Sequence, residues 1–229
     1  MPTSMPTRKH HWLRWVLVVL AAVVALVVGG TILFVDALAG PALAPLALPS
    51  LSTAAAGGSQ STIDGTWTAG QGSAAGYRVR ISILGQGGDL VGRTSAVTGT
   101  VVIAGTQASS ASFSVDLTTL ESGGKPQPQL AQILGTAAYP NATFTLTTPI
   151  ALGSTPAVGG IFTVSATGML AMDGTSRSVT VPITARWDGS ALYALGSIPI
   201  SFSDWNIKTP FGLEDHGSVE FLLVLNRQP

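Results

Sequence analysis

The chain has 229 residues, of which 11 are basic and 11 are acidic, and charged side chains make up only 10% of it. An average soluble domain carries about 25% charged residues, and the lack of a basic surplus argues against a nucleic-acid partner. The chain contains no cysteine, which excludes a disulfide framework, a cysteine zinc site and a thiol nucleophile.

The N-terminal part predicts one membrane-spanning helix. Residues 1–14 form a tail with three basic side chains, and residues 15–35 carry no charge. As a helix the second stretch would be about 31 Å long, which matches a hydrocarbon core of roughly 30 Å. No further Lys or Arg occurs before Arg78. The positive-inside rule therefore predicts a single-pass cell-membrane protein with a cytoplasmic N-terminus and an extracytoplasmic (periplasmic) C-terminal domain.

A cleaved signal peptide is the alternative for the same segment. Ala37, Leu38 and Ala39 form a small-x-small cleavage site directly after the apolar run. Cleavage near Ala39 would release the domain as a secreted protein. Both alternatives export the C-terminal domain.

Residues 36–61 predict a flexible linker. Ala, Pro, Gly and Ser dominate this stretch, and Pro41, Pro45 and Pro49 recur every four residues. Proline at that spacing precludes a continuous helix, and the stretch has neither aromatic residues nor alternation.

Residues 62–229 predict one all-β domain. Apolar and polar residues alternate almost throughout, as in Tyr77, Val79 and Ile81, and this period of two is typical of β-strands. Eight strands are expected, near 77–84, 91–104, 110–118, 142–149, 161–172, 177–188, 191–203 and 217–227. Asp173-Gly174 and Asp188-Gly189 predict tight hairpin turns. A short helix is expected at Pro126–Leu134. Eight long antiparallel strands favour a barrel over a compact sandwich.

The domain shows no recognisable catalytic or metal centre. His216 is its only histidine, and we expect it in an exposed loop just before the last strand. A zinc site would need further ligands, and a hydrolase of the G-x-S-x-G type would need that motif, which is absent. We therefore predict no enzyme activity, no catalytic residues and no metal. A hydrolase or isomerase that uses His216 remains the least favoured reading.

Several ordered stretches resemble the YceI-like family of exported, lipocalin-like proteins that bind polyisoprenoids. The resemblance runs from about Gly65 to Arg227. Its stretches are Gly65-Thr-Trp67, Gly76-Tyr-Arg-Val79, Val91-Gly-Arg-Thr94, Ser112 to Leu117, Leu120-Glu-Ser122, Tyr139-Pro140 with Ala142-Thr-Phe144, Gly168-Met-Leu170 with Asp173-Gly-Thr175, Val179 to Pro182 and Phe202 to Trp205. The chain departs from the family pattern at Gly124–Pro128, where an Arg-Asp pair is common. Few lysines and many Ala and Gly residues are associated with GC-rich bacteria, such as actinobacteria.

The resemblance implies an eight-stranded antiparallel lipocalin-like barrel that holds a long apolar ligand, an isoprenoid quinone or polyprenyl lipid, for carriage or storage. No other cofactor is expected, and a protein partner is unknown. We predict that the barrel lining comes from one apolar strand face: Tyr77, Val79, Ile81, Phe113, Val115, Phe144, Leu146, Leu170, Phe202, Trp205 and Phe221. Since periodicity does not distinguish a hollow interior from a filled one, a filled-core module that binds another envelope protein is the alternative.

Overall fold

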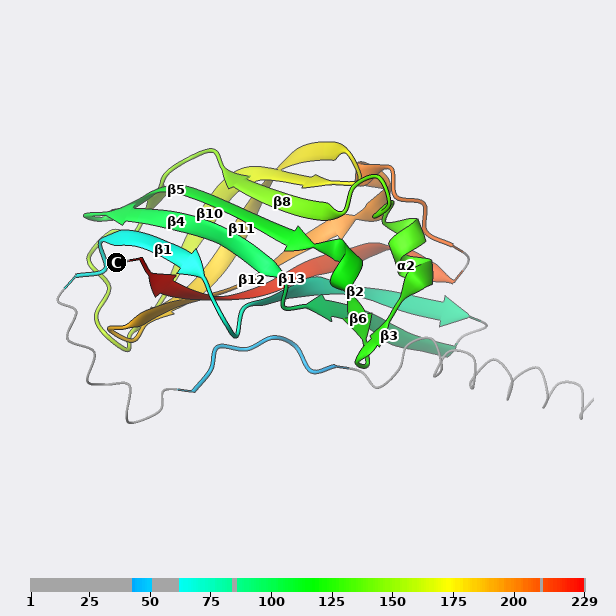
Figure 1. Cartoon of the computed structure of the whole chain (residues 1–229), viewed down its shortest axis with the longest axis horizontal. Coiled ribbons are helices and arrows are strands. Elements are labelled where there is room, and N and C mark those ends of the chain that lie inside the picture. Colours follow the sequence, from blue (N-terminus) through cyan, green and yellow to red (C-terminus); the bar gives the residue numbers. More distant parts are fainter. Residues whose placement is uncertain (1–42, 51–61, 84–85, 211, 229) are drawn as a thin grey trace, which may run out of the picture.

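The computed structural model describes residues 43–50, 62–83, 86–210 and 212–228 (Figure 1). The predicted basic tail and membrane helix lie outside these residues. Within the described ranges, no helix is both long and apolar enough to cross a membrane.

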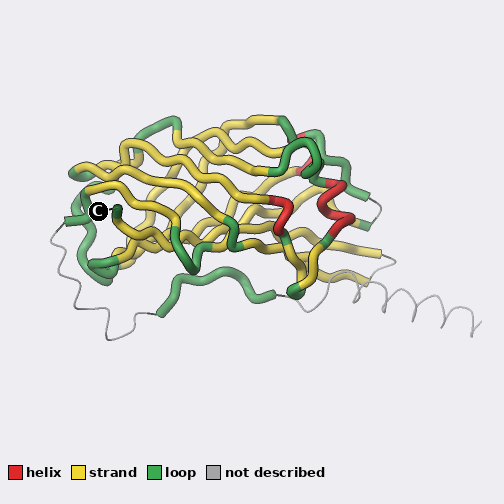
Figure 2. Tube along the Cα trace, in the orientation of Figure 1, coloured by secondary structure: helices red, strands yellow, loops and turns green. Residues whose placement is uncertain are grey.

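Strands dominate the described residues, as Figure 2 shows. They are β1 (Gly65–Ala69), β2 (Ala74–Ile83), β3 (Gln86–Thr94), β4 (Val97–Ala104), β5 (Gln107–Asp116), β6 (Glu121–Ser122), β7 (Lys125–Pro126), β8 (Asn141–Leu146), β9 (Ile150–Ala151), β10 (Ile161–Met172), β11 (Thr175–Trp187), β12 (Ala191–Ser201) and β13 (Leu213–Arg227). In the described ranges, one short α-helix, α2 (Pro128–Ile133), and two 3-10 turns, η2 (Leu117–Thr119) and η3 (Phe202–Trp205), accompany these strands.

The strands close into an eight-stranded antiparallel barrel, as the sequence predicts. Around the ring, β1 pairs with β4, and the order continues through β5, β8, β10, β11, β12 and β13, which pairs back with β1. β1 and β2 follow each other along the chain and both pair with β13, so together they form one bent strand of the ring. In the same way, β3 and β4 form a second bent strand, which pairs with the first. The ring from β1 to β13 therefore closes without a free edge, whereas among the described residues the outer side of β3 pairs only at Arg93, with Glu121 of β6.

The β3–β4 bend corrects one predicted strand. The pattern from 91 to 104 predicts an unbroken strand, but the chain turns at Ser95 and Ala96. The hydroxyl of Thr94 accepts a hydrogen bond from the amide of Ala96 at 2.9 Å, and the amide of Val97 donates to the carbonyl of Ser95 at 2.8 Å. These local bonds replace ladder pairing, so the strand splits where the barrel wall changes direction.

The two predicted hairpin turns are present. Asp173 and Gly174 join β10 to β11 with positive φ angles of 45° and 70°, as a type I′ turn requires. Asp188 starts the β11–β12 turn, and its carboxylate accepts hydrogen bonds from the amides of Ser190 and Ala191 at 2.8 and 2.7 Å. The predicted helix is confirmed as α2, with Gly135 just beyond it at a φ of 59°.

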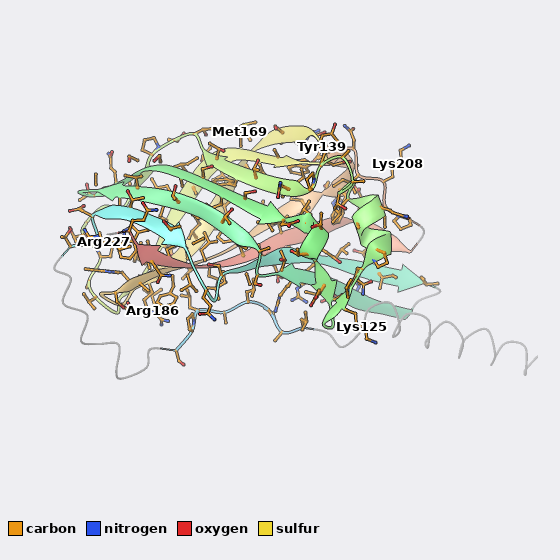
Figure 3. All side chains as sticks on the ribbon, in the orientation of Figure 1. Lys125, Tyr139, Met169, Arg186, Lys208 and Arg227 are labelled. Carbon is orange, nitrogen blue, oxygen red and sulfur yellow. The ribbon has the colours of Figure 1, made fainter. Side chains whose placement is uncertain are left out.

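Two apolar cores lie in different halves of the barrel. The α2-end core includes Phe202 and Trp205 of η3, together with Leu134 and Met172, all of them buried. The β1-end core surrounds Trp67, which is fully buried and donates from Nε1 to the carbonyl of Ile63 at 2.8 Å. Figure 3 places Lys125, Tyr139 and Lys208 at the α2 end and Arg227 at the opposite end.

Residues 43–50, within the predicted linker, lie extended along the outer wall of the barrel (Figure 1). We call this segment the strap. Arg78 donates from Nη2 to the carbonyl of Leu43 at 3.1 Å, Arg93 donates to the carbonyl of Ala44, and Arg186 donates to the carbonyl of Pro49. Three arginines of three different strands therefore hold the strap through its backbone.

Candidate functional site

The barrel interior contains a cavity of about 160 Å³. Of its 29 lining residues, 28 are apolar, and Thr143 is the exception. Most of the lining belongs to the β1-end core or packs against it. An apolar cavity of roughly 150 Å³ stays dry and can hold a benzene ring, so the site is suited to an uncharged, apolar group and to nothing that needs hydrogen bonds.

Small residues on the inner faces of the strands create this space. Seven alanines line the cavity: Ala75, Ala108, Ala111, Ala142, Ala166, Ala185 and Ala194. At the α2 end, the corresponding volume is taken by large side chains, notably Phe202 and Trp205. The same alternating strand pattern therefore produces a hollow half and a filled half, and the difference lies in side-chain size.

The cavity brings together six of the eleven predicted lining residues. They are Phe113, Val115, Phe144, Leu146, Leu170 and Phe221. Their inward direction follows from strand alternation, and the cross-strand pair of Phe113 with Phe144 joins β5 to β8 on the inner wall.

The other five predicted lining residues are buried but do not line this cavity: Tyr77, Val79, Ile81, Phe202 and Trp205. Tyr77 and Val79 face inward, but they meet the filled α2-end core. Phe202 and Trp205 belong to η3 rather than to a wall strand, and they help to fill that end. Burial was predictable for all five, whereas their position along the barrel axis was not.

Sequence reasoning did not include several lining residues in the predicted set. Phe162, Ile183 and Leu223 alternate on predicted strands, so their inward direction was available from the period of two. Ile63 and Leu152 lie in segments without a strand pattern, and no sequence signal marked them.

An open groove lined in part by Arg177, Ser201 and His216 contains the only histidine of residues 62–229. His216 lies within β13 rather than in a loop, because β13 begins at Leu213, although its side chain is exposed as expected. Nδ1 of His216 lies 2.9 Å from Oγ of Ser201, its cross-strand partner on β12. The neighbouring carboxylate of Asp215 instead accepts hydrogen bonds from the amide and hydroxyl of Ser203, which lower its pKa.

This groove does not form a charge-relay triad. A triad needs a carboxylate that orients the histidine, and among the described residues no carboxylate hydrogen-bonds to His216. The described part of the chain also contains no cluster of three His, Asp or Glu residues that could hold a metal ion.

Comparison with known proteins agrees with this geometry. The model of the YceI-like domain matches residues 61–225. The chain belongs to the YceI-like family. The match spans all the barrel strands described above except the last two residues of β13.

Solved structures share the YceI-like fold of this chain. A polyisoprenoid-binding domain from Saccharophagus degradans, implicated in plant cell wall breakdown, has a TM-score of 0.56 at 16% identity, and the match covers 71% of this chain and 98% of that one. BcnA from Burkholderia cenocepacia has a TM-score of 0.52 at 22% identity, and the match covers 66% of this chain and 95% of that one. No curated protein sequence matches the chain.

Proposed function

We propose that the barrel binds a long apolar chain, an isoprenoid quinone or polyprenyl lipid, and carries or stores it without performing catalysis. The observation that carries this proposal is the cavity of about 160 Å³ with an almost wholly apolar lining. Membership of the YceI-like family and the likeness to a polyisoprenoid-binding domain support the ligand class.

The volume and the energetics fit one segment of such a ligand. A cavity near 150 Å³ holds about six carbon atoms, which is close to one five-carbon isoprene unit. Burying that unit contributes about 4 kcal/mol at most, at roughly 0.8 kcal/mol per carbon, and ordering of a flexible chain offsets part of this gain. A longer chain therefore needs more room than the cavity offers at rest.

The proposal includes a location. Residues 15–35 would anchor the protein in the cell membrane with the barrel outside the cytoplasm, and cleavage near Ala39 would release it. A filled-core module that binds an envelope protein is the competing function. The hollow half of the barrel does not favour it, because a filled core would have no need for seven cavity-lining alanines.

Lipid analysis of the full-length protein tests the proposal. Ala194 lies on the inner face of β12 and lines the cavity, so Ala194→Phe would place a ring in the space that the ligand needs. Ala104→Phe is the matched control, because Ala104 is exposed on β4. Each protein is purified from membranes, extracted and examined by mass spectrometry.

We expect an isoprenoid lipid with the wild type and with Ala104→Phe, and a loss of at least about tenfold with Ala194→Phe. Wild type that carries no more isoprenoid than Ala194→Phe would contradict the proposal.

A further inference from the structure

Three side chains lie where the two apolar cores of the barrel meet. Phe144 of β8, Ile183 of β11 and Phe221 of β13 are partly buried residues that pack against both cores, and all three line the cavity. We call these three residues the waist. In the ring order, β8 and β13 are separated by β10, β11 and β12, so Phe144 and Phe221 stand on opposite walls.

The cavity continues past the waist. Leu170 and Ile198 line it and belong to the α2-end core, and Val219 lines it and packs against that core. An apolar chain that enters from the β1-end half therefore meets the waist before it reaches these three residues.

Glycines on neighbouring strands allow both phenylalanine rings to lie flat against the wall. Gly196 of β12 is paired with Phe221 of β13, and a Cβ atom at Gly196 would lie 2.3 Å from Cζ of that ring. A Cβ atom at Gly168 of β10 would lie 2.5 Å from Cζ of Phe144. Carbon atoms cannot approach so closely, so the rings occupy space that exists only because these positions lack a side chain.

We propose that these ring–glycine pairs determine how long a chain the barrel accepts. With glycine at 196 and 168, Phe144 and Phe221 fold against the wall and leave the waist passable. A side chain at 196 would push the ring of Phe221 into the waist and confine the ligand to the β1-end half. This inference rests on the proposed function, because it assigns the length selectivity of the same cavity.

The barrel contains an internal control for this effect. Tyr77 of β2 lies over Gly92 of β3, its cross-strand partner, and a Cβ atom at Gly92 would lie 2.3 Å from Cε1 of Tyr77. Tyr77 packs in the filled α2-end core and does not line the cavity. Gly92→Ala therefore causes a steric conflict of the same kind as Gly196→Ala, but away from the waist.

A competition experiment on the full-length protein tests the inference. Geraniol, farnesol and geranylgeraniol, with two, three and four isoprene units, are offered together to protein in lipid nanodiscs, and the bound alcohols are counted by native mass spectrometry. For each protein we take the amount of bound geranylgeraniol divided by the amount of bound geraniol, and this ratio is compared between variant and wild type. Each alcohol partitions into the nanodisc lipid to the same extent in both samples, so that partitioning cancels in the comparison. Thermal unfolding reports whether each variant folds.

We expect Gly196→Ala to lower this ratio by about tenfold or more and Gly92→Ala to change it by less than about twofold. The double variant Gly196→Ala/Phe221→Leu should restore the ratio, because leucine has no ring to displace. Phe221→Leu alone should raise the ratio, and Ile183→Phe should lower it. These two variants test the inference even where Gly196→Ala does not fold.

Each remaining outcome counts against the inference. An unchanged ratio in Gly196→Ala and Ile183→Phe would show that the waist does not limit chain length, while the proposed function would stand. Equal decreases in Gly196→Ala and Gly92→Ala would indicate a general loss of packing instead. Wild type that binds none of the three alcohols would overturn the proposed function and, with it, this inference.

Discussion

Arg78 donates from Nε to Oε1 of Glu220 at 2.7 Å, which joins β2 to β13 on the outer wall of the barrel. Arg93 of β3 approaches the other oxygen of the same carboxylate at 3.4 Å. The side chains of Arg78 and Glu220 are only 20% and 12% exposed, and the hydrogen bond to Glu220 raises the pKa of Arg78. The two arginines that hold the start of the strap thus share one carboxylate.

Replacing Glu220 should lower stability. Glu220→Gln leaves Arg78 and Arg93 partly buried beside a neutral group, and we expect the free energy of unfolding to fall by about 1–3 kcal/mol. Urea unfolding measures it. Glu214→Gln is the control, because Glu214 lies 3.9 Å from Arg80 with both side chains about half exposed, and it should cost less than about 0.5 kcal/mol. Equal losses in the two variants would be inconsistent with this account.

The Asp188 turn should give an acid-dependent contribution to stability. Burial alone raises the pKa of Asp188, but hydrogen bonds from Ala191, Ser190 and Tyr193 outweigh it and lower the pKa. A carboxylate with a lowered folded-state pKa stabilises the fold fully above its unfolded value of about 3.9, and this contribution disappears as the pH falls through the folded value.

We therefore expect Asp188→Asn to be less stable than the wild type by about 1–2 kcal/mol at pH 7. The difference should persist down to about pH 4 and shrink below it. Urea unfolding at a series of pH values measures both proteins. A difference that stays constant through the acid range would contradict the assignment.

Tyr77→Phe should not destabilise the barrel. The hydroxyl of Tyr77 is buried without a hydrogen-bond partner among the described residues, and burial raises its pKa, so it stays neutral. Removing an unpaired buried hydroxyl should leave the free energy of unfolding unchanged or raise it by up to about 1 kcal/mol. Tyr193→Phe is the comparison, because the hydroxyl of Tyr193 donates to Asp188 at 3.1 Å. This substitution should lower thermal stability. A loss of stability in Tyr77→Phe would show that the hydroxyl is paired.

The strap should become accessible when Arg186 is replaced. The guanidinium of Arg186 donates to the carbonyl of Pro49 and lies 5.7 Å from the ring centre of Tyr193. Arg186→Met keeps the apolar stem but loses the hydrogen bond, and a loss of about 1 kcal/mol should speed cleavage after Leu46 by about fivefold. Limited proteolysis with chymotrypsin measures the rate. Arg80→Met, at an exposed site, should leave it unchanged, and an unchanged rate in Arg186→Met would argue that the strap does not depend on this contact.

The fold was largely predictable because the alternation of side chains is strong on most strands. The expected strand at 161–172 coincides with β10, and the glycine turns lie where the tight hairpins form. β1 was missed because Trp67 is the only large apolar side chain among its five residues, which leaves too short an alternation to detect. The start of β3 was missed because Gly87 and Gly88 are typical of turns, whereas here they pair with Ser82 and Ile81.

The sequence predicts which side chains of the candidate site point into the barrel, but not where each one lies along the barrel axis. The period of two correctly turns both Tyr77 and Phe113 inward, yet Tyr77 faces the filled half and Phe113 faces the cavity. Their depth depends on the stagger between strands and on η3, which brings Phe202 and Trp205 into one end of the barrel. Sequence spacing carries neither quantity.

The strap also has a consequence for orientation. It begins at Leu43 beside Arg78 and Arg93 of β2 and β3, and it runs to Pro49 beside Arg186, near the β11–β12 turn. Only seven residues separate Leu43 from Val35, the end of the predicted membrane span. A membrane anchor at residues 15–35, as proposed, would therefore join the barrel beside β2 and β3 on the outer wall, while the far end of the strap lies at the half of the barrel that contains most of the cavity lining.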